Sequence, residues 1–231
     1  MYLYPKIDSL DYTERIIETN DWATYLLVGC FLLLAVAKYF YPKRFDEFVL
    51  MPLSNKYLSV YGKDDAIYHP FSMILFVVQV VCVSIFIYLL FEAFNPTEAQ
   101  ENPWLFVQIA TGYATFVLIK LSIEKIVANI FSMDAIIDQY LHQKLSHRNF
   151  LALLIFLGNL FFLYFYPGTS FSLLIFALTI LLFNTIALIS SYKKNGNLVV
   201  SNFFHFIVYL CALEISPYII LYKVFFTEVS I

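Results

Sequence analysis

The stretch NFLALLIFLGNLFFLYFYPGTSFSLLIFALTILLFNTIALISSY, residues 149–192, contains no charged side chain. A single helix over it would be about 66 Å long, roughly twice the thickness of the hydrocarbon core of a bilayer. Pro167-Gly168 lies near its middle, and this dipeptide marks a turn. The stretch therefore predicts two membrane-spanning helices in a tight hairpin, over residues 149–166 and 170–191.

The rest of the chain has the same apolar character. Of its 231 residues, 61% are hydrophobic and 13% are charged, whereas soluble domains carry about 45–50% apolar and about 25% charged residues. We therefore expect an all-α, polytopic transmembrane bundle that forms a single membrane domain over residues 1–231. Its first residues, 1–21, are expected to form an outer N-terminal tail. Further apolar windows of spanning length cover residues 22–40, 71–92, 104–129 and 203–225. Together with the hairpin they bring the expected number of spans to about six.

The distribution of lysine and arginine predicts the orientation of these spans. All basic residues except Lys6, Arg15 and Lys223 fall on one side of the predicted membrane. Basic residues concentrate on the cytoplasmic side of inner-membrane proteins. The pattern predicts a multi-pass protein of a bacterial inner membrane with both termini outside (N-out, C-out) and with residues 41–70 and 130–148 in the cytoplasm.

Two of the predicted cytoplasmic stretches have an apolar stripe at helical spacing. Residues 44–61 place Phe45, Phe48, Val49 and Leu53 on one side, which is typical of a short helix lying in the membrane interface, interrupted near Pro52. Residues 120–145 are interpreted as a cytoplasmic extension of the span over 104–129. Each stripe either packs on the protein's own bundle or on lipid, or docks a partner protein. The candidate docking stripe consists of Ile123, Ile126, Ile130, Met133 and Ile137.

Charged residues at membrane depth are the first candidates for a functional site, because they are costly there. Glu214 lies about 16 Å into the last predicted span. It is either a proton-titrating or partner-clamping carboxylate, or a hydrogen-bonded residue that only holds the bundle together. Lys120 and Glu124 are four residues apart and can form an ion pair on one helix face. Lys120 either extends to the cytoplasmic boundary or belongs to a pair lining a membrane cavity.

Uncharged polar residues also fall inside the predicted spans. Gln79, Asn159 and Asn184 lie in the second, fourth and fifth spans, at similar depth in the cytoplasmic half. Such side chains form hydrogen bonds between helices worth about 0.6 kcal/mol each. Together with Glu214 they are candidates for one polar layer.

Histidines gather at the predicted cytoplasmic ends of the spans. His69, His147 and His205 stand near the starts of the second, fourth and sixth spans. They form a candidate cluster for a membrane-embedded enzyme acting on lipids, although no metal-ligand spacing links them. We expect no metal, no cofactor and no nucleic-acid partner, because the chain has no phosphate-binding or catalytic motif and a net charge of −3.

These observations favour a non-enzymatic function. The first hypothesis is an integral inner-membrane subunit, or an assembly or accessory factor, of a larger membrane complex, with the lipid bilayer and other proteins as partners. The alternatives are a small proton-coupled transporter or channel using Glu214, and a lipid-modifying enzyme.

Several stretches of the sequence also resemble a known family. The stretches NDWATYLLVG (20–29), YPKRFDEFVL (41–50), NKYLSVYGK (55–63), HPF (69–71) and FVLIKLSIEKI (116–126) are similar to a family of multi-pass inner-membrane proteins of Bacteroidota, classed as a domain of unknown function. The resemblance runs over most of the chain. It implies an inner-membrane location and a single compact helical domain, and it assigns no activity and no catalytic residue.

Overall fold

The computed structural model of the chain describes residues 21–51, 57, 69–130, 134–166 and 169–194. All regular structure within these ranges is helical, which confirms the predicted all-α class. The predicted span over residues 203–225 lies outside the described residues. The helices in chain order are α1 (Asp21–Phe40), α2 (Pro42–Val49), α4 (Pro70–Phe94), α5 (Pro96–Glu101), α6 (Leu105–Ile130), α7 (Asp134–Leu160), the π-helical turn η1 (Phe161–Phe165) and α8 (Ser170–Lys194).

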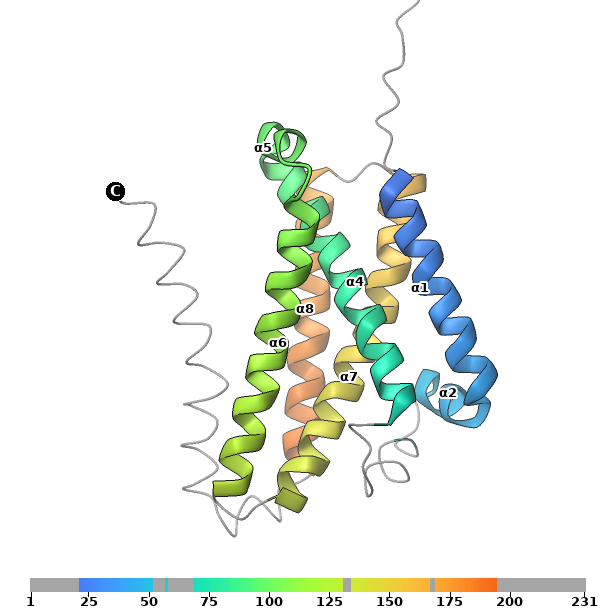
Figure 1. Ribbon diagram of the computed structural model, residues 1–231, viewed down its shortest axis with the longest axis vertical. Coiled ribbons are helices and arrows are strands. Elements are labelled where there is room, and N and C mark those ends of the chain that lie inside the picture. The colour runs from blue at the N-terminus through green and yellow to red at the C-terminus, as the bar shows by residue number, and fades with distance from the viewer. Residues whose placement is uncertain (1–20, 52–56, 58–68, 131–133, 167–168, 195–231) are drawn as a thin grey trace, which may run out of the picture.

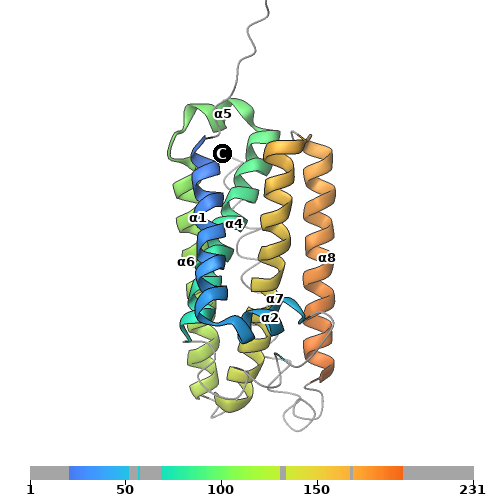
Figure 2. The same ribbon diagram turned by 90° about the vertical axis from the view of Figure 1, so that its right-hand side faces the viewer.

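The long helices stand side by side and alternate in direction (Figures 1 and 2). Helix α4 packs against α1, α6 and α7, and α8 packs against α7 and α4. The short helix α5 lies at one end of the bundle, between the end of α4 and the start of α6. The short helix α2 lies at the other end, where α1 finishes and α4 begins (Figure 1).

Four of the described helical segments are long and apolar enough to cross a membrane. They cover Asp21–Phe40, Pro70–Phe94, Leu105–Ile126 and Leu141–Phe165, and α8 contributes a shorter apolar stretch, Ser170–Ile186. Large apolar side chains such as Phe31, Ile119 and Leu182 are exposed on the outside of the bundle. Because water would disfavour such a surface and lipid would not, the fold is that of a membrane protein.

Prolines fix where several helices begin. Pro42, Pro70 and Pro96 each occupy the first helical position, where the missing N–H costs no hydrogen bond. His69 precedes Pro70, and its Nδ1 accepts a hydrogen bond from the Phe71 N–H at 3.2 Å. This side-chain cap satisfies one of the free N–H groups at the start of α4.

The predicted cytoplasmic extension of the third span is wrong. Helix α6 ends at Ile130, and residues 134–148 form the first half of α7, which continues into the predicted fourth span. The two arms run antiparallel and pair their opposite charges, Glu124 with Lys144 and Lys125 with Asp138. A straight extension would leave these charges without that pairing.

The interfacial helix predicted over residues 44–61 is only partly described. Helix α2 begins at Pro42, and Phe48 at its C-terminal end is fully buried. The Phe48 ring packs edge-on against Phe71 of α4, Phe150 of α7 and Tyr57. Phe48 of the predicted stripe therefore packs on the protein's own bundle, whereas Val49 is exposed, and Leu53 lies outside the described residues.

At the opposite end of the bundle, aromatic rings join α4, α7 and α8. The Phe176 ring on α8 lies edge-on to Phe86 of α4 and Phe162 of η1, with centroid distances of 5.4 and 5.5 Å. Gly158 of α7 faces the same ring, and a Cβ built there would stand 2.3 Å from Phe176 Cζ. The close approach of α7 and α8 therefore depends on a residue without a side chain at position 158.

The substitution Gly158→Ala should destabilise the bundle by roughly 1–3 kcal/mol, the usual cost of overpacking, because Phe86 and Phe162 hold the Phe176 ring in place. Thermal unfolding of the purified protein in detergent measures the loss. Gly112→Ala is the matched control, since no atom lies within 4 Å of a Cβ at that helical glycine. Equal melting temperatures for the two variants would show that α7 and α8 do not approach as described.

Candidate functional site

Two ion pairs connect the antiparallel arms of α6 and α7. Lys144 Nζ on α7 donates to Glu124 Oε1 on α6 at 2.6 Å. The Glu124 side chain is fully buried, and that of Lys144 is only 11% exposed. The second pair, Lys125 with Asp138 at 3.2 Å, lies closer to the ends of the arms and is much more exposed.

The buried pair is a strong constraint on the packing of α6 against α7. Removing one partner of a buried pair leaves an uncompensated charge and costs about 3–5 kcal/mol. Within the described part of the chain, Lys144 contacts the carboxylate through Oε1 alone, and Glu124 Oε2 has no hydrogen-bond partner. The pairing of Glu124 with a residue on the next helix is not what the four-residue spacing from Lys120 predicted.

Lys120 lies inside the bundle and does not extend to its surface. Its residue exposure is 7%, which excludes the interpretation of a side chain reaching into the headgroup region. The Glu124–Lys144 pair fixes the register of the two antiparallel helices. Lys120 lies one turn before Glu124 on α6, and Arg148 lies one turn after Lys144 on α7. This register therefore places Lys120 level with Arg148.

Uncharged polar residues connect the helices further into the bundle. Gln79 Nε2 on α4 donates to Tyr113 Oη on α6 at 2.7 Å, and Asn159 Nδ2 on α7 donates to the Cys82 carbonyl of α4 at 2.8 Å. Gln79 and Asn159 are fully buried. Asn184 lies partly buried on α8, and no hydrogen bond in the described part of the chain joins it to the other two. The predicted polar layer therefore consists of two contacts to α4.

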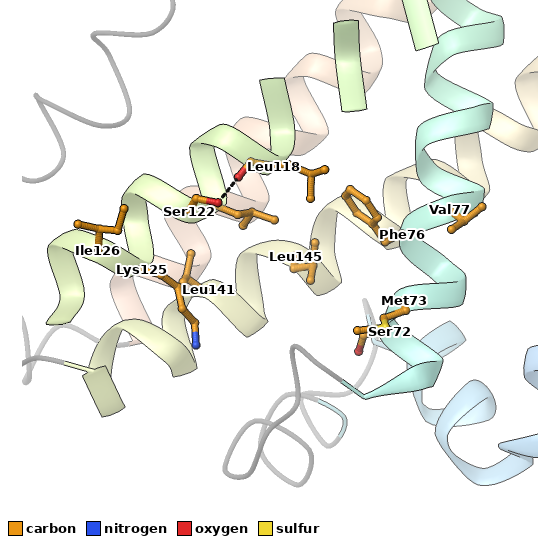
Figure 3. A pocket seen from close by; sticks show the side chains of 11 residues that line it. Ser72, Met73, Phe76, Val77, Leu118, Ser122, Lys125, Ile126, Leu141 and Leu145 are labelled. Atoms are coloured by element: carbon orange, nitrogen blue, oxygen red, sulfur yellow. Dashed lines mark hydrogen bonds between the residues drawn. The ribbon is translucent and has the colours of Figure 1, made fainter. Parts of the chain in front are cut away.

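A groove of about 630 Å³ opens between α4, α6 and α7, towards the end of the bundle that carries the ion pairs. Figure 3 shows side chains from all three helices around it. Most of the lining is apolar, and Ser122 turns its hydroxyl back onto the Leu118 carbonyl at 2.9 Å. The lining residues are Ser72, Met73, Phe76 and Val77 of α4, Leu118, Leu121, Ser122, Lys125 and Ile126 of α6, and Leu141 and Leu145 of α7.

The predicted docking stripe does not form one continuous surface. Ile126 is exposed and lines the groove, whereas Ile123 is exposed but is not part of that lining. Ile130 ends α6, and Ile137 belongs to the next helix. Met133 lies outside the described residues. The prediction assumed one continuous helix from Ile123 to Ile137, whereas these residues belong to two antiparallel helices, α6 and α7.

The described histidines at this end of the bundle make separate local contacts. Within the described residues, no group of three His, Cys, Asp or Glu side chains is arranged to hold a metal ion. His147 Nδ1 contacts the Gln143 carbonyl of its own helix at 2.7 Å. His69 caps α4 near Tyr41, and burial together with the nearby Arg44 guanidinium lowers the pKa of His69 below its usual range. His205 lies outside the described residues, as does Glu214.

Sequence reasoning missed several partners in this site. Lys144 and Tyr113 supply the contacts of Glu124 and Gln79, and the buried His142 stacks on Tyr57 with a centroid distance of 5.8 Å. Opposite charges at Glu124 and Lys144 on either side of residues 131–133 were the available signal, because a reversal of the chain there brings the two arms together.

The comparisons with known proteins place the chain in a family and assign no activity to it. The family model described as domain of unknown function DUF4271 matches residues 23–225 of the chain. The chain belongs to the DUF4271 family. Comparison with curated proteins and with solved structures found no match.

The variants Glu124→Gln and Lys144→Met should each lower the free energy of unfolding by about 3–5 kcal/mol, because each leaves one buried charged or polar group without its partner. The double variant Glu124→Leu with Lys144→Met should recover much of that loss. Chemical denaturation in detergent provides the measurement. As an exposed control, Asp138→Asn removes the partner of Lys125 and should cost no more than about 1 kcal/mol. Equal losses at the two pairs would contradict the buried constraint.

Proposed function

We propose that this protein is a non-enzymatic membrane subunit, or an assembly or accessory factor, that binds an apolar segment of a partner protein in the groove between α4, α6 and α7. The single observation that carries the proposal is the groove itself, which is large and mainly apolar and opens on the side of the bundle. Membrane helices associate through close packing at such surfaces. The hydrophobic effect does not drive this association, because lipid tails are as apolar as the side chains.

The chemistry of the lining favours binding over catalysis. Lys125 is the only titratable side chain among the described residues that line the groove, and it forms an ion pair with Asp138. A general acid–base or nucleophilic mechanism needs at least one reactive group directed at a substrate. The groove is a concave, mainly apolar surface with polar groups at its margin. Such a surface suits the binding of a helix.

The groove walls are held by contacts that make the surface rigid. Glu124–Lys144 fixes α6 against α7, and Gln79–Tyr113 fixes α4 against α6. A preformed surface reduces the ordering cost of binding. These polar contacts therefore support the proposed function without taking part in any chemistry.

We further propose six spans with both termini outside, in a bacterial inner membrane. In the described chain, the α5 end carries Glu98 and Glu101 and no lysine or arginine, whereas the opposite end carries Lys43, Arg44 and Lys125 among others. The rule that basic residues remain in the cytoplasm supports an outward α5 and an inward α2. The sixth span is the one predicted over residues 203–225.

Cysteine labelling of whole cells tests this orientation. In a chain whose three native cysteines are replaced, Glu98→Cys should react with a membrane-impermeant maleimide in intact cells with a permeabilised outer membrane. Lys43→Cys should react only after the inner membrane is opened, because α2 lies on the cytoplasmic side. Both positions are exposed in the fold, so differences in burial do not explain the result. Labelling in the reverse order would overturn the proposed topology.

Filling the groove tests the proposed function. Met73→Trp on α4 and Ile126→Trp on α6 should each release a partner that otherwise co-purifies in stoichiometric amount in mild detergent, because the indole occupies the space of the bound segment. Quantitative mass spectrometry of the purified complexes provides the measurement.

Ile186→Trp on α8 is the matched control for Ile126→Trp. The two isoleucines are 62% and 59% exposed, and Ile186 does not line the groove. The control should retain the partner. If no partner co-purifies, or if both groove variants retain it, the proposed function is wrong.

A further inference from the structure

Two cysteines face each other between α1 and α4. The Cys82 thiol on α4 donates to the Cys30 sulfur on α1 with an Sγ–Sγ distance of 3.9 Å, and both side chains are buried in the apolar core of the bundle. Cys82 is the middle residue of α4, and Cys30 is one of the two middle residues of α1. In a bundle that spans the bilayer, the two thiols therefore lie about 15 Å from either surface of the hydrocarbon core.

We propose that Cys30 and Cys82 are a redox pair, which a lipid-soluble oxidant of the quinone class converts into an intramolecular disulfide bond between α1 and α4. In this step the two S–H bonds break and one S–S bond forms. The two electrons and the two protons pass to the quinone, which becomes the hydroquinone, so the step leaves no charge in the apolar core. In bacteria, quinones are established acceptors of electrons that come from protein thiols.

The distance between the two thiols suits this reaction. The sulfur atoms of a disulfide are about 2.0 Å apart, so the two Sγ atoms need to approach each other by roughly 1.9 Å. Helix α4 is held at this level, because Asn159 Nδ2 of α7 donates to the Cys82 carbonyl at 2.8 Å. Helix α1 stands at the edge of the bundle (Figures 1 and 2) and is the partner that is free to shift. The disulfide would convert a packing contact of α1 into a covalent link.

The apolar surroundings determine the class of oxidant. Leu27, Val78 and Ile85 belong to the same buried cluster as the two cysteines. A charged, water-soluble oxidant such as oxidised glutathione would lose its hydration before it reached this depth, which is costly. A neutral quinone dissolves in the hydrocarbon core. Gly29 lies next to Cys30 on α1, and no atom lies within 4 Å of a Cβ built there, so a quinone ring can approach the α1 backbone beside this thiol.

Counting the free thiols of the full-length native chain tests the proposal. The chain is reconstituted in vesicles without oxygen and incubated with an alkylated benzoquinone whose ring is fully substituted, so that thiols do not remain attached to it. N-ethylmaleimide is then added in denaturant, and mass spectrometry of the intact protein counts the alkylated cysteines. The count should fall from three to one, because the chain has three cysteines and two of them enter the disulfide. A digest without reductant should contain the peptides of Cys30 and Cys82 joined together.

A matched control moves one thiol around α4 at nearly the same depth. In the variant Cys82→Ala with Val83→Cys, the thiol is displaced by one residue and turns by about 100° around the helix axis. Val83 is partly buried against the same cluster, so its surroundings are also apolar. This variant should keep three alkylated cysteines after quinone treatment. Oxidation at the rate of the native chain would show that the contact between the two thiols does not direct the reaction, and would overturn the pairing.

The remaining outcomes decide the chemistry. Oxidised glutathione should leave the count at three during the time in which the quinone completes the reaction, and an equal rate for the two reagents would overturn the assignment to a lipid-soluble oxidant. Three alkylated cysteines after quinone treatment of the native chain would overturn the redox pair and leave the thiols as apolar packing groups only. A disulfide that includes Cys211 would overturn it as well. Because neither Cys30 nor Cys82 lines the groove and no partner protein is needed, the result is independent of the co-purification test of the proposed function.

Discussion

The buried ion pair between Glu124 and Lys144 is the constraint on which the rest of the fold depends. A charged carboxylate without exposure inside a membrane bundle is tolerated only beside an opposite charge. This requirement holds α6 and α7 in one antiparallel register and keeps Glu124 and Lys144 directed inward. The outward sides of α6 are then left apolar, and the groove beside α4 has walls whose relative positions are fixed.

Helix α4 provides the second constraint, because it contacts every other long helix that the structure describes. At one level Gln79 and Asn159 connect it to α6 and α7 through hydrogen bonds. Near its other end Phe86 joins the aromatic contact with Phe162 and Phe176, where Gly158 permits close packing. Polar bonds and close packing therefore take the place of the hydrophobic effect, which does not drive association between helices in lipid.

The helical class was predictable because the energetic cost of unpaired backbone groups in lipid leaves few alternatives to a helix. The charge-free stretch 149–192 and its Pro167-Gly168 pair predicted a hairpin, and helices flank that pair in the structure. The path of residues 120–145 was not predictable from spacing, since an apolar stripe continues across a reversal of the chain. Sequence reasoning had named Glu124, Gln79 and Asn159 as polar residues within the predicted spans, and the structure buries all three. Their partners were missed because Lys144, Tyr113 and the Cys82 carbonyl lie on other helices.

The central claim is that the charges of Lys120 and Glu124 on α6 are enclosed by protein while the apolar sides of this helix face outward. The most direct measurement is a spin-label accessibility scan of positions 117–126 in lipid vesicles, using oxygen as the apolar probe and a water-soluble nickel chelate as the polar one. The account predicts low accessibility to both probes at positions 120 and 124, and higher oxygen accessibility at positions 118 and 126, where the side chains are exposed. High nickel accessibility at positions 120 and 124 would contradict it, because the charges would then line a water-filled path.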